Sequence, residues 1–153
     1  MSAAARPTSA QSRRLRAPLL LALWALLALE AAGGLVVFFA RLVAGTTPGM
    51  ALHVGGGLAL VCVYAAYQWT HWRRVAPWRP RLDYTLGLVA AASLTLALAT
   101  GLPLAFEWWP RRADTGAPYT AWLSGAHNVM SMFVLTFAGA HLFAVLQRAR
   151  RRS

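Results

Sequence analysis

The hydrophobic positions of this chain fall into four long, nearly unbroken runs separated by short polar segments. An apolar run of about 20 residues is long enough to cross a hydrocarbon layer of about 30 Å as a helix, because each helical residue rises about 1.5 Å. The pattern therefore predicts four membrane-spanning helices. Their expected ranges are residues 17–40, 50–72, 84–106 and 121–147.

The connections between these helices are short, which makes neighbouring helices antiparallel. We therefore predict an all-α, integral membrane, up-down-up-down four-helix bundle. It occupies residues 15–149, which is most of the 153-residue chain, and leaves no room for a soluble catalytic domain. Residues 1–14 are rich in Ala, Ser and Arg and are expected to be disordered, and residues 150–153 form a short basic tail.

The net charge is +11 because fifteen arginines stand against four acidic residues. Their distribution indicates membrane topology rather than nucleic-acid binding, since the arginines gather before the first span, between the second and third spans, and after the fourth. Only Arg41, Arg111 and Arg112 fall on the opposite side. Cationic residues are enriched in cytoplasmic segments, so both termini are expected to be cytoplasmic.

The chain has four histidines, two in the second predicted helix and two in the fourth. Each residue turns an α-helix by about 100°, so the eighteen residues from His53 to His71 give about five full turns. The fourteen residues from His127 to His141 leave an offset of only about 40°. Each helix therefore presents its two histidines on one face. Because the two helices run in the same direction, His53 should meet His127 near the outer surface, and His71 should meet His141 near the inner one.

Facing imidazoles on separate helices suit iron in a haem, which takes one axial ligand above and one below. Filling both axial positions leaves no site for oxygen and favours electron transfer. We therefore predict two haem b groups, with a single haem or none as alternatives. Covalent haem attachment is excluded because the chain has no CxxCH motif. The histidine pairs are spaced by about 27 Å on one helix and about 21 Å on the other, a difference that helix tilt near 20° can absorb.

Several other residues are candidate cofactor contacts. Gly57 lies one turn from His53 on the same face, where bare backbone would let a haem approach closely. Arg41 is placed to pair with outer haem propionates, and Arg73 and Arg74 with inner ones. Ordinary helix packing explains glycines equally well, and the arginines also serve as topology signals.

Two carboxylates are candidate proton acceptors for a quinol. Glu30 lies within the first predicted span, and an ionisable residue there is a functional candidate by default. Its alternatives are a hydrogen bond to a neighbouring helix or exposure to outer headgroups. Glu107 ends the third predicted span at the outer surface, where it is otherwise an ordinary interfacial acid.

Parallel helices two and four, each with two histidines, resemble the di-haem bundle of cytochrome b in the quinol–cytochrome c reductases. They are also similar to the cytochrome b subunits of formate dehydrogenases and nickel–iron hydrogenases. The spacing His127-x13-His141 matches that pattern, whereas His53-x17-His71 is longer. The resemblance implies a membrane subunit in a prokaryotic inner membrane. It would pass electrons between a quinone and an extrinsic c-type cytochrome or iron–sulfur protein.

Two other functions stay open from the sequence, and with them the question of whether the chain is an enzyme. The first is a self-contained transmembrane oxidoreductase of the cytochrome b561 type. The second is a non-redox membrane anchor or assembly subunit in which the histidines are structural.

Overall fold

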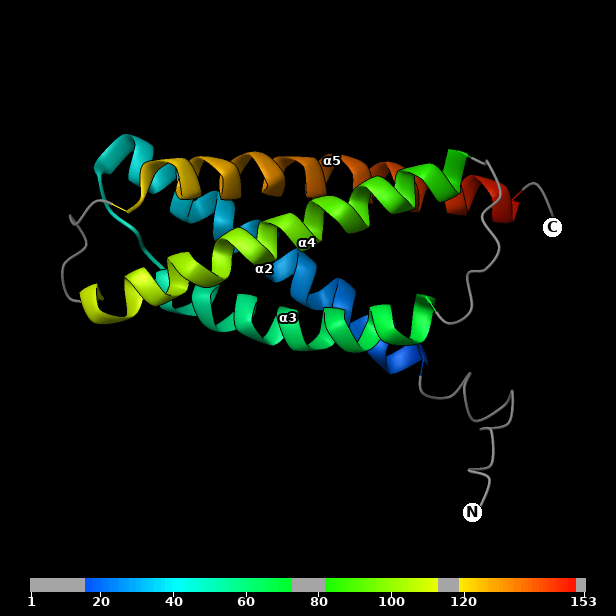
Figure 1. Cartoon of the computed structure of the whole chain (residues 1–153). Helices are drawn as coiled ribbons and strands as arrows, with labels where there is room; N and C mark the ends of the chain where they lie inside the picture. Colours follow the sequence, from blue (N-terminus) through cyan, green and yellow to red (C-terminus); the bar gives the residue numbers. More distant parts are fainter. Residues whose placement is uncertain (1–15, 73–81, 113–118, 151–153) are drawn as a thin grey trace, which may run out of the picture.

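The computed structural model describes residues 16–72, 82–112 and 119–150. Within these ranges the chain forms four α-helices and a short 3₁₀ turn, in the order α2 (Arg16–Ala44), α3 (Met50–Trp72), α4 (Leu82–Trp108), η1 (Trp109–Arg111) and α5 (Ala121–Arg150). Consecutive helices run in opposite directions, so α3 and α5 are parallel (Figure 1). All four are long and apolar enough to cross a membrane. The predicted all-α four-helix bundle is confirmed, and the chain has the character of a multi-pass membrane protein.

Three of the four helices are longer than the predicted spans. The range of α3 agrees with the prediction, but α2 continues to Ala44, α4 extends at both ends, and α5 continues to Arg150. Backbone hydrogen bonding does not stop where the hydrocarbon ends, because the interfacial layers add roughly 10–15 Å to the membrane. Arg150 therefore belongs to a helix rather than to the predicted tail. The expected disorder of residues 1–14 lies outside the described residues.

A tight turn between α2 and α3 places His53 one turn inside α3. Gly45 and Gly49 both have positive φ, 65° and 75°, a conformation that glycine adopts without steric cost. The amide of Gly45 donates to the carbonyl of Arg41 at 3.1 Å and closes α2. The amide of His53 donates to the carbonyl of Gly49 at 3.0 Å, which joins the turn to α3. We call this end of the bundle the outer end, following the topology that the arginines predict.

The start of α5 is capped by the end of α4. The backbone amide of Thr120 donates to Oε2 of Glu107 at 3.0 Å, and its hydroxyl donates to Oε1 at 2.6 Å. The amide of Ser124 in turn donates to the carbonyl of Thr120 at 3.0 Å. Free amides at a helix start need such partners. This cap fixes where α5 begins relative to α4, and so the height of His127 in the bundle.

The four helices pack as two hairpins. The α4–α5 contact is the most extensive and the α2–α3 contact comes next, whereas α3 and α4 approach each other at only a few positions. A cluster of buried side chains closes the middle of the bundle: Leu23, Leu60, Tyr64 and Leu94. The Tyr64 hydroxyl donates to the carbonyl of Ala91 at 2.8 Å and accepts from Gln68 at 2.7 Å. A buried tyrosine needs such partners, and here they join α3 to α4.

The outward faces of the helices are apolar. Leu21 is 71% exposed, Phe106 77% and Trp122 72%. Exposed side chains of this size and number would be costly in water and are favourable in lipid. The surface is therefore compatible with contact to membrane lipid.

Candidate functional site

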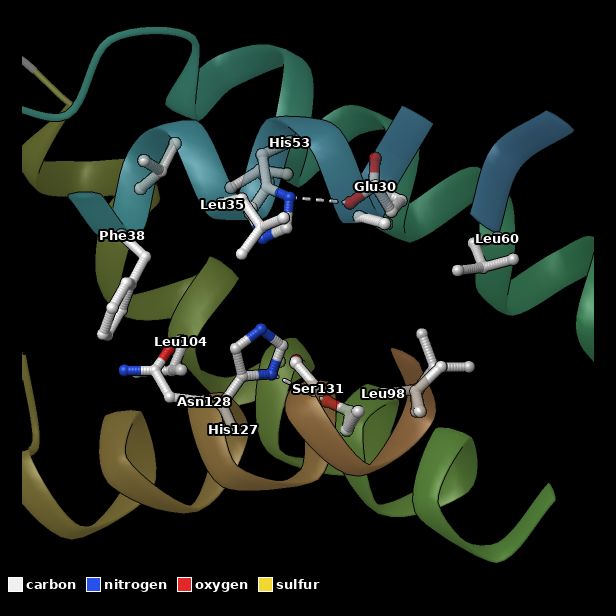
Figure 2. Close-up of a pocket in the computed structure, with 18 of the residues that line it drawn as sticks. Glu30, Leu35, Phe38, His53, Leu60, Leu98, Leu104, His127, Asn128 and Ser131 are labelled. Atoms are coloured by element: carbon white, nitrogen blue, oxygen red, sulfur yellow. Dashed lines mark hydrogen bonds and ion pairs between the residues drawn. The ribbon is translucent and has the colours of Figure 1, made fainter. Parts of the chain in front are cut away.

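His53 of α3 and His127 of α5 face each other in the outer half of the bundle. Their ring centroids are 6.2 Å apart and the ring planes are inclined by 68°. Figure 2 shows the two rings pointing toward one another from opposite helix hairpins. The helical rotation and the parallel course of α3 and α5 therefore bring together the pair that the sequence indicated.

Each of these rings contacts a polar partner through Nδ1. Nδ1 of His127 donates to the carbonyl of Ala97 at 2.9 Å, and a carbonyl has no proton to give, so the proton is on Nδ1. Nδ1 of His53 lies 2.8 Å from Oε2 of Glu30, in contact but not aligned as a hydrogen bond. Because Nδ1 of each ring faces a partner within its own hairpin, Nε2 points toward the space between the hairpins (Figure 2). This is the arrangement in which histidines bind metals.

Both histidines rest on glycines of the neighbouring helix in their own hairpin. A Cβ at Gly34 would lie 3.2 Å from Cε1 of His53, and a Cβ at Gly101 would lie 3.0 Å from Cε1 of His127. These contacts are tighter than ordinary van der Waals packing. The glycines therefore allow the rings to lie flat against α2 and α4, and an added side chain would push them away.

His141 is held in the same way as His127. Its Nδ1 donates to the carbonyl of Asp83 at 2.7 Å, and a Cβ at Gly87 would lie 2.8 Å from its Cε1. In both cases the accepting carbonyl belongs to the residue four positions before the glycine. The α4–α5 hairpin thus contains one arrangement twice, fourteen residues apart. The equal spacing of the two glycines and the two histidines is a sequence signal that could have indicated this pairing.

His71 has different surroundings. It is exposed in the last turn of α3, its ring stacks on Tyr67 at 5.3 Å, and its Nδ1 lies 3.4 Å from the Tyr67 hydroxyl. Tyr67, rather than His71, stands fourteen residues after His53. Neither His71 nor His141 lines the cavity described below. The inner histidine pair therefore stays a prediction.

A cavity of about 740 Å³ separates the two hairpins in the outer half of the bundle. Its wall is mostly apolar, with Glu30, Arg41, His53 and His127 among its polar members. Ligand pockets of roughly 300–1,000 Å³ bury drug-sized molecules, so this space is large enough for an apolar ligand of that size. Figure 2 shows that Glu30 and His53 reach it from one side and His127 from the other.

The separation of the two rings is compatible with two imidazoles that bind one metal ion. Imidazole nitrogens bind such metals at about 2 Å, and two rings on opposite sides of one ion then have centroids about 6 Å apart. The measured separation of His53 and His127 is 6.2 Å. Within the described ranges no group of three or more His, Cys, Asp or Glu residues could hold a metal ion. A haem needs only two axial protein ligands, because the porphyrin supplies the others.

The remaining candidate residues have separate positions. Arg41 lines the outer end of the cavity, and its guanidinium stands over the Tyr119 ring at 4.9 Å. Partial burial raises the pKa of the Tyr119 phenol, so this ring stays neutral. Gly57 also lines the cavity, near Glu30. Arg73 and Arg74 lie outside the described residues.

The two candidate carboxylates differ in what they contact. Glu107 uses both oxygens to cap α5 and does not line the cavity. Glu30 lines the cavity and contacts His53 across the α2–α3 interface. Their predicted quinol role is not tested by these contacts. The contact between Glu30 and His53 was not identified from the sequence, which offered only a hydrogen bond to some neighbouring helix.

Comparison with known proteins adds no relative, since no family model, curated protein or solved structure matches the chain.

Adjacent glycines of α3 give a matched test of the Glu30 position. A Cβ at Gly56 would overlap Oε1 of Glu30, whereas a Cβ at Gly55 meets nothing within 4 Å. Gly56→Ala should therefore displace the carboxylate from His53, and the cost of moving this buried group, about 1–3 kcal/mol, should exceed the gain of about 0.5–1 kcal/mol from replacing a helical glycine. Gly55→Ala should be neutral or stabilise α3 by about 0.5–1 kcal/mol. Thermal unfolding in detergent measures the difference, and equal transition temperatures would contradict the placement of Glu30.

Proposed function

We propose that this chain is a membrane b-type cytochrome subunit that carries electrons between a quinone pool and a partner redox protein. A haem between His53 and His127 would supply reversible one-electron transfer between ferric and ferrous iron. The observation that carries the proposal is the meeting of two imidazoles at 6.2 Å across a large apolar cavity. Nδ1 of His127 donates to the protein, as metal-binding histidines do, and Nδ1 of His53 contacts a carboxylate at 2.8 Å.

The chain's own residues would bind, orient and shield the cofactor. Gly34 and Gly101 let the ligand rings approach α2 and α4, and Ala97 fixes the tautomer of His127. The apolar cavity wall would exclude water from the porphyrin faces. Arg41 lies at the outer end of this wall, where a guanidinium can pair with a propionate.

A second haem at the inner end is part of the proposal. His141 supports it because its ring is held by a glycine and a carbonyl in the same way as that of His127. The facing ligand would be His71, as the helical rotation predicts. Two haems stacked along α3 and α5 would let electrons cross most of the membrane.

The partner and the setting follow from the predicted topology. We place the chain in a prokaryotic inner membrane with both termini cytoplasmic, and we place the extrinsic c-type cytochrome or iron–sulfur partner at the outer end. Glu30 and Glu107 remain the proposed proton acceptors for quinol oxidation.

Purification of the chain from membranes and a pyridine haemochrome assay test this function. We expect a reduced-minus-oxidised spectrum of b-type haem and two haems per chain. One haem per chain would restrict the proposal to the outer site. A colourless protein after expression with ample haem would contradict the proposal and favour a non-redox anchor. Reduction of a soluble substrate without any partner would favour a transmembrane oxidoreductase of the cytochrome b561 type.

A further inference from the structure

The two histidines of the outer pair have unlike partners. His127 donates from Nδ1 to a neutral backbone carbonyl, that of Ala97. His53 has a carboxylate in the corresponding place, with Oε2 of Glu30 at 2.8 Å from Nδ1. His141 also uses a carbonyl. Among the three histidines whose rings rest on glycines, His53 is therefore the one that the structure places against a carboxylate.

The carboxylate is buried inside the bundle. The side chain of Glu30 is 11% exposed and that of His53 is 22% exposed. Oε1 of Glu30 and Nδ1 of His53 are both buried without a hydrogen-bond partner. An ionisable group within a membrane span is costly and is kept where it pairs with another group. The electrostatic interaction between Glu30 and His53 is therefore stronger at this low-dielectric position than it would be in water.

The space for this contact is built by both helices. Glu30 of α2 fits over Gly56 of α3, where a Cβ would overlap it. His53 of α3 fits over Gly34 of α2, four residues after Glu30. Each helix therefore supplies a bare glycine backbone to the other's polar side chain. This reciprocal packing holds the carboxylate against Nδ1 of His53 at the wall of the cavity.

We propose that Glu30 is a positioning residue that sets the electron-donating strength of His53 and so lowers the reduction potential of the outer haem. The inference rests on the proposed function, since it concerns the same haem. A metal-binding imidazole becomes a stronger ligand base when a carboxylate accepts its Nδ1 proton, and Oε2 of Glu30 lies within reach of Nδ1 of His53 at 2.8 Å, although it is not aligned as a hydrogen bond. A stronger base and a nearby negative charge both stabilise ferric over ferrous iron. Second-shell contacts of this kind are among the means by which proteins set haem potentials.

Glu30→Gln tests the inference, because it removes the charge and keeps the shape and an acceptor oxygen. Potentiometric titration of the full-length protein in detergent, followed by haem absorbance, gives the midpoint of each haem. We expect one midpoint to rise by about 59 mV or more, which is a tenfold change in a one-electron equilibrium constant. The low-spin EPR signal of the same haem should shift as well.

Asp83→Asn is the matched control. It removes a side-chain carboxylate that pairs with Arg148 rather than with a histidine and does not line the cavity. The midpoint that Glu30→Gln raises should stay at its wild-type value in this variant, and an equal rise there would overturn the inference in favour of a general charge effect. Unchanged midpoints in Glu30→Gln, with haem bound, would overturn it too, while leaving the proposed function intact. Absence of haem from the wild-type protein would instead defeat the proposed function.

Glu30→Asp covers the case in which the glutamine variant does not bind haem. Aspartate keeps the charge but is shorter, which weakens the contact with Nδ1 of His53. We expect a smaller rise in the same midpoint. A midpoint equal to or below that of the wild type would contradict the inference.

Discussion

Replacement of His127 by alanine should remove one haem per chain from the purified protein. The substitution deletes one of the two imidazoles that meet across the cavity, and His53 alone would then have to hold the haem. The other polar residues of α5 that line the cavity are Ser124, Asn128 and Ser131, and none of them offers an imidazole nitrogen to replace the one that is lost. The pyridine haemochrome assay should fall from two haems per chain to one. His53→Ala should give the same result.

Two controls separate loss of a ligand from loss of the fold. Cys62→Ala changes an exposed residue of α3 and should leave the haem content unchanged. Imidazole added to the His127→Ala protein can enter the space left by the ring and should restore part of the haem binding.

His141→Ala should instead remove the inner haem and leave the outer one. Retention of both haems in His127→Ala would contradict its assignment as a ligand.

Gly101→Leu should reduce the haem content nearly as much as His127→Ala, although it leaves both ligand histidines in the sequence. A Cβ at this position would already lie 3.0 Å from Cε1 and 3.2 Å from Nδ1 of His127, and a leucine side chain extends further. The ring must therefore leave its place on α4 and lose the carbonyl of Ala97. Overpacking of this kind costs about 1–3 kcal/mol, so the bundle should fold with reduced stability. We expect the outer haem to be missing from most molecules by the same haemochrome assay.

Gly125→Leu is the matched control for this experiment. Gly125 lies on α5, two residues before His127, but a Cβ there meets nothing within 4 Å. Its haem content should equal that of the wild type. Gly101→Ala should give an intermediate loss, because the methyl group alone is tighter than normal packing. If Gly101→Leu keeps both haems and an unaltered spectrum, the ring of His127 does not depend on α4 for its orientation.

The helices themselves could be predicted because lipid imposes a simple requirement. A chain in hydrocarbon must satisfy its backbone hydrogen bonds within each segment, so long apolar runs become helices. The helix ends were predicted less accurately than the helices, because they depend on local contacts that hydropathy does not report. The cap between Glu107 and Thr120 joins residues thirteen positions apart through the connection from α4 to α5. Its sequence signal is too weak to distinguish it from an ordinary interfacial acid.

The meeting of His53 and His127 could be predicted from helix geometry and from the tendency of ionisable residues in a span to face the bundle interior. Rotation of about 100° per residue and parallel helices were enough to place both rings on facing sides. The glycines and the carboxylate that contact the two rings could not be derived in this way. Whether Gly34 or Gly101 lies opposite a histidine depends on how far neighbouring helices slide and rotate against each other. The contact between Glu30 and His53 depends on the same sliding and rotation of α2 against α3.

The inner pair shows where the argument from spacing is weakest. The eighteen residues between His53 and His71 return to the same angle but rise about 27 Å, further than the two histidines of α5. In the structure His71 is exposed in the last turn of α3, while His141 is partly buried against α4. Angle alone therefore predicts the face of a helix better than it predicts the depth at which two residues meet.

The division of the bundle into hairpins has a consequence for how its two halves are held together. The contacts described above that orient His53 lie within α2 and α3, and those that orient His127 and His141 lie within α4 and α5. Each hairpin therefore orients its own imidazoles. Among the described residues, direct contact between the two hairpins is limited. A ligand bound by His53 and His127 together would therefore bridge the hairpins and add to the stability of the whole bundle, by binding the folded state alone.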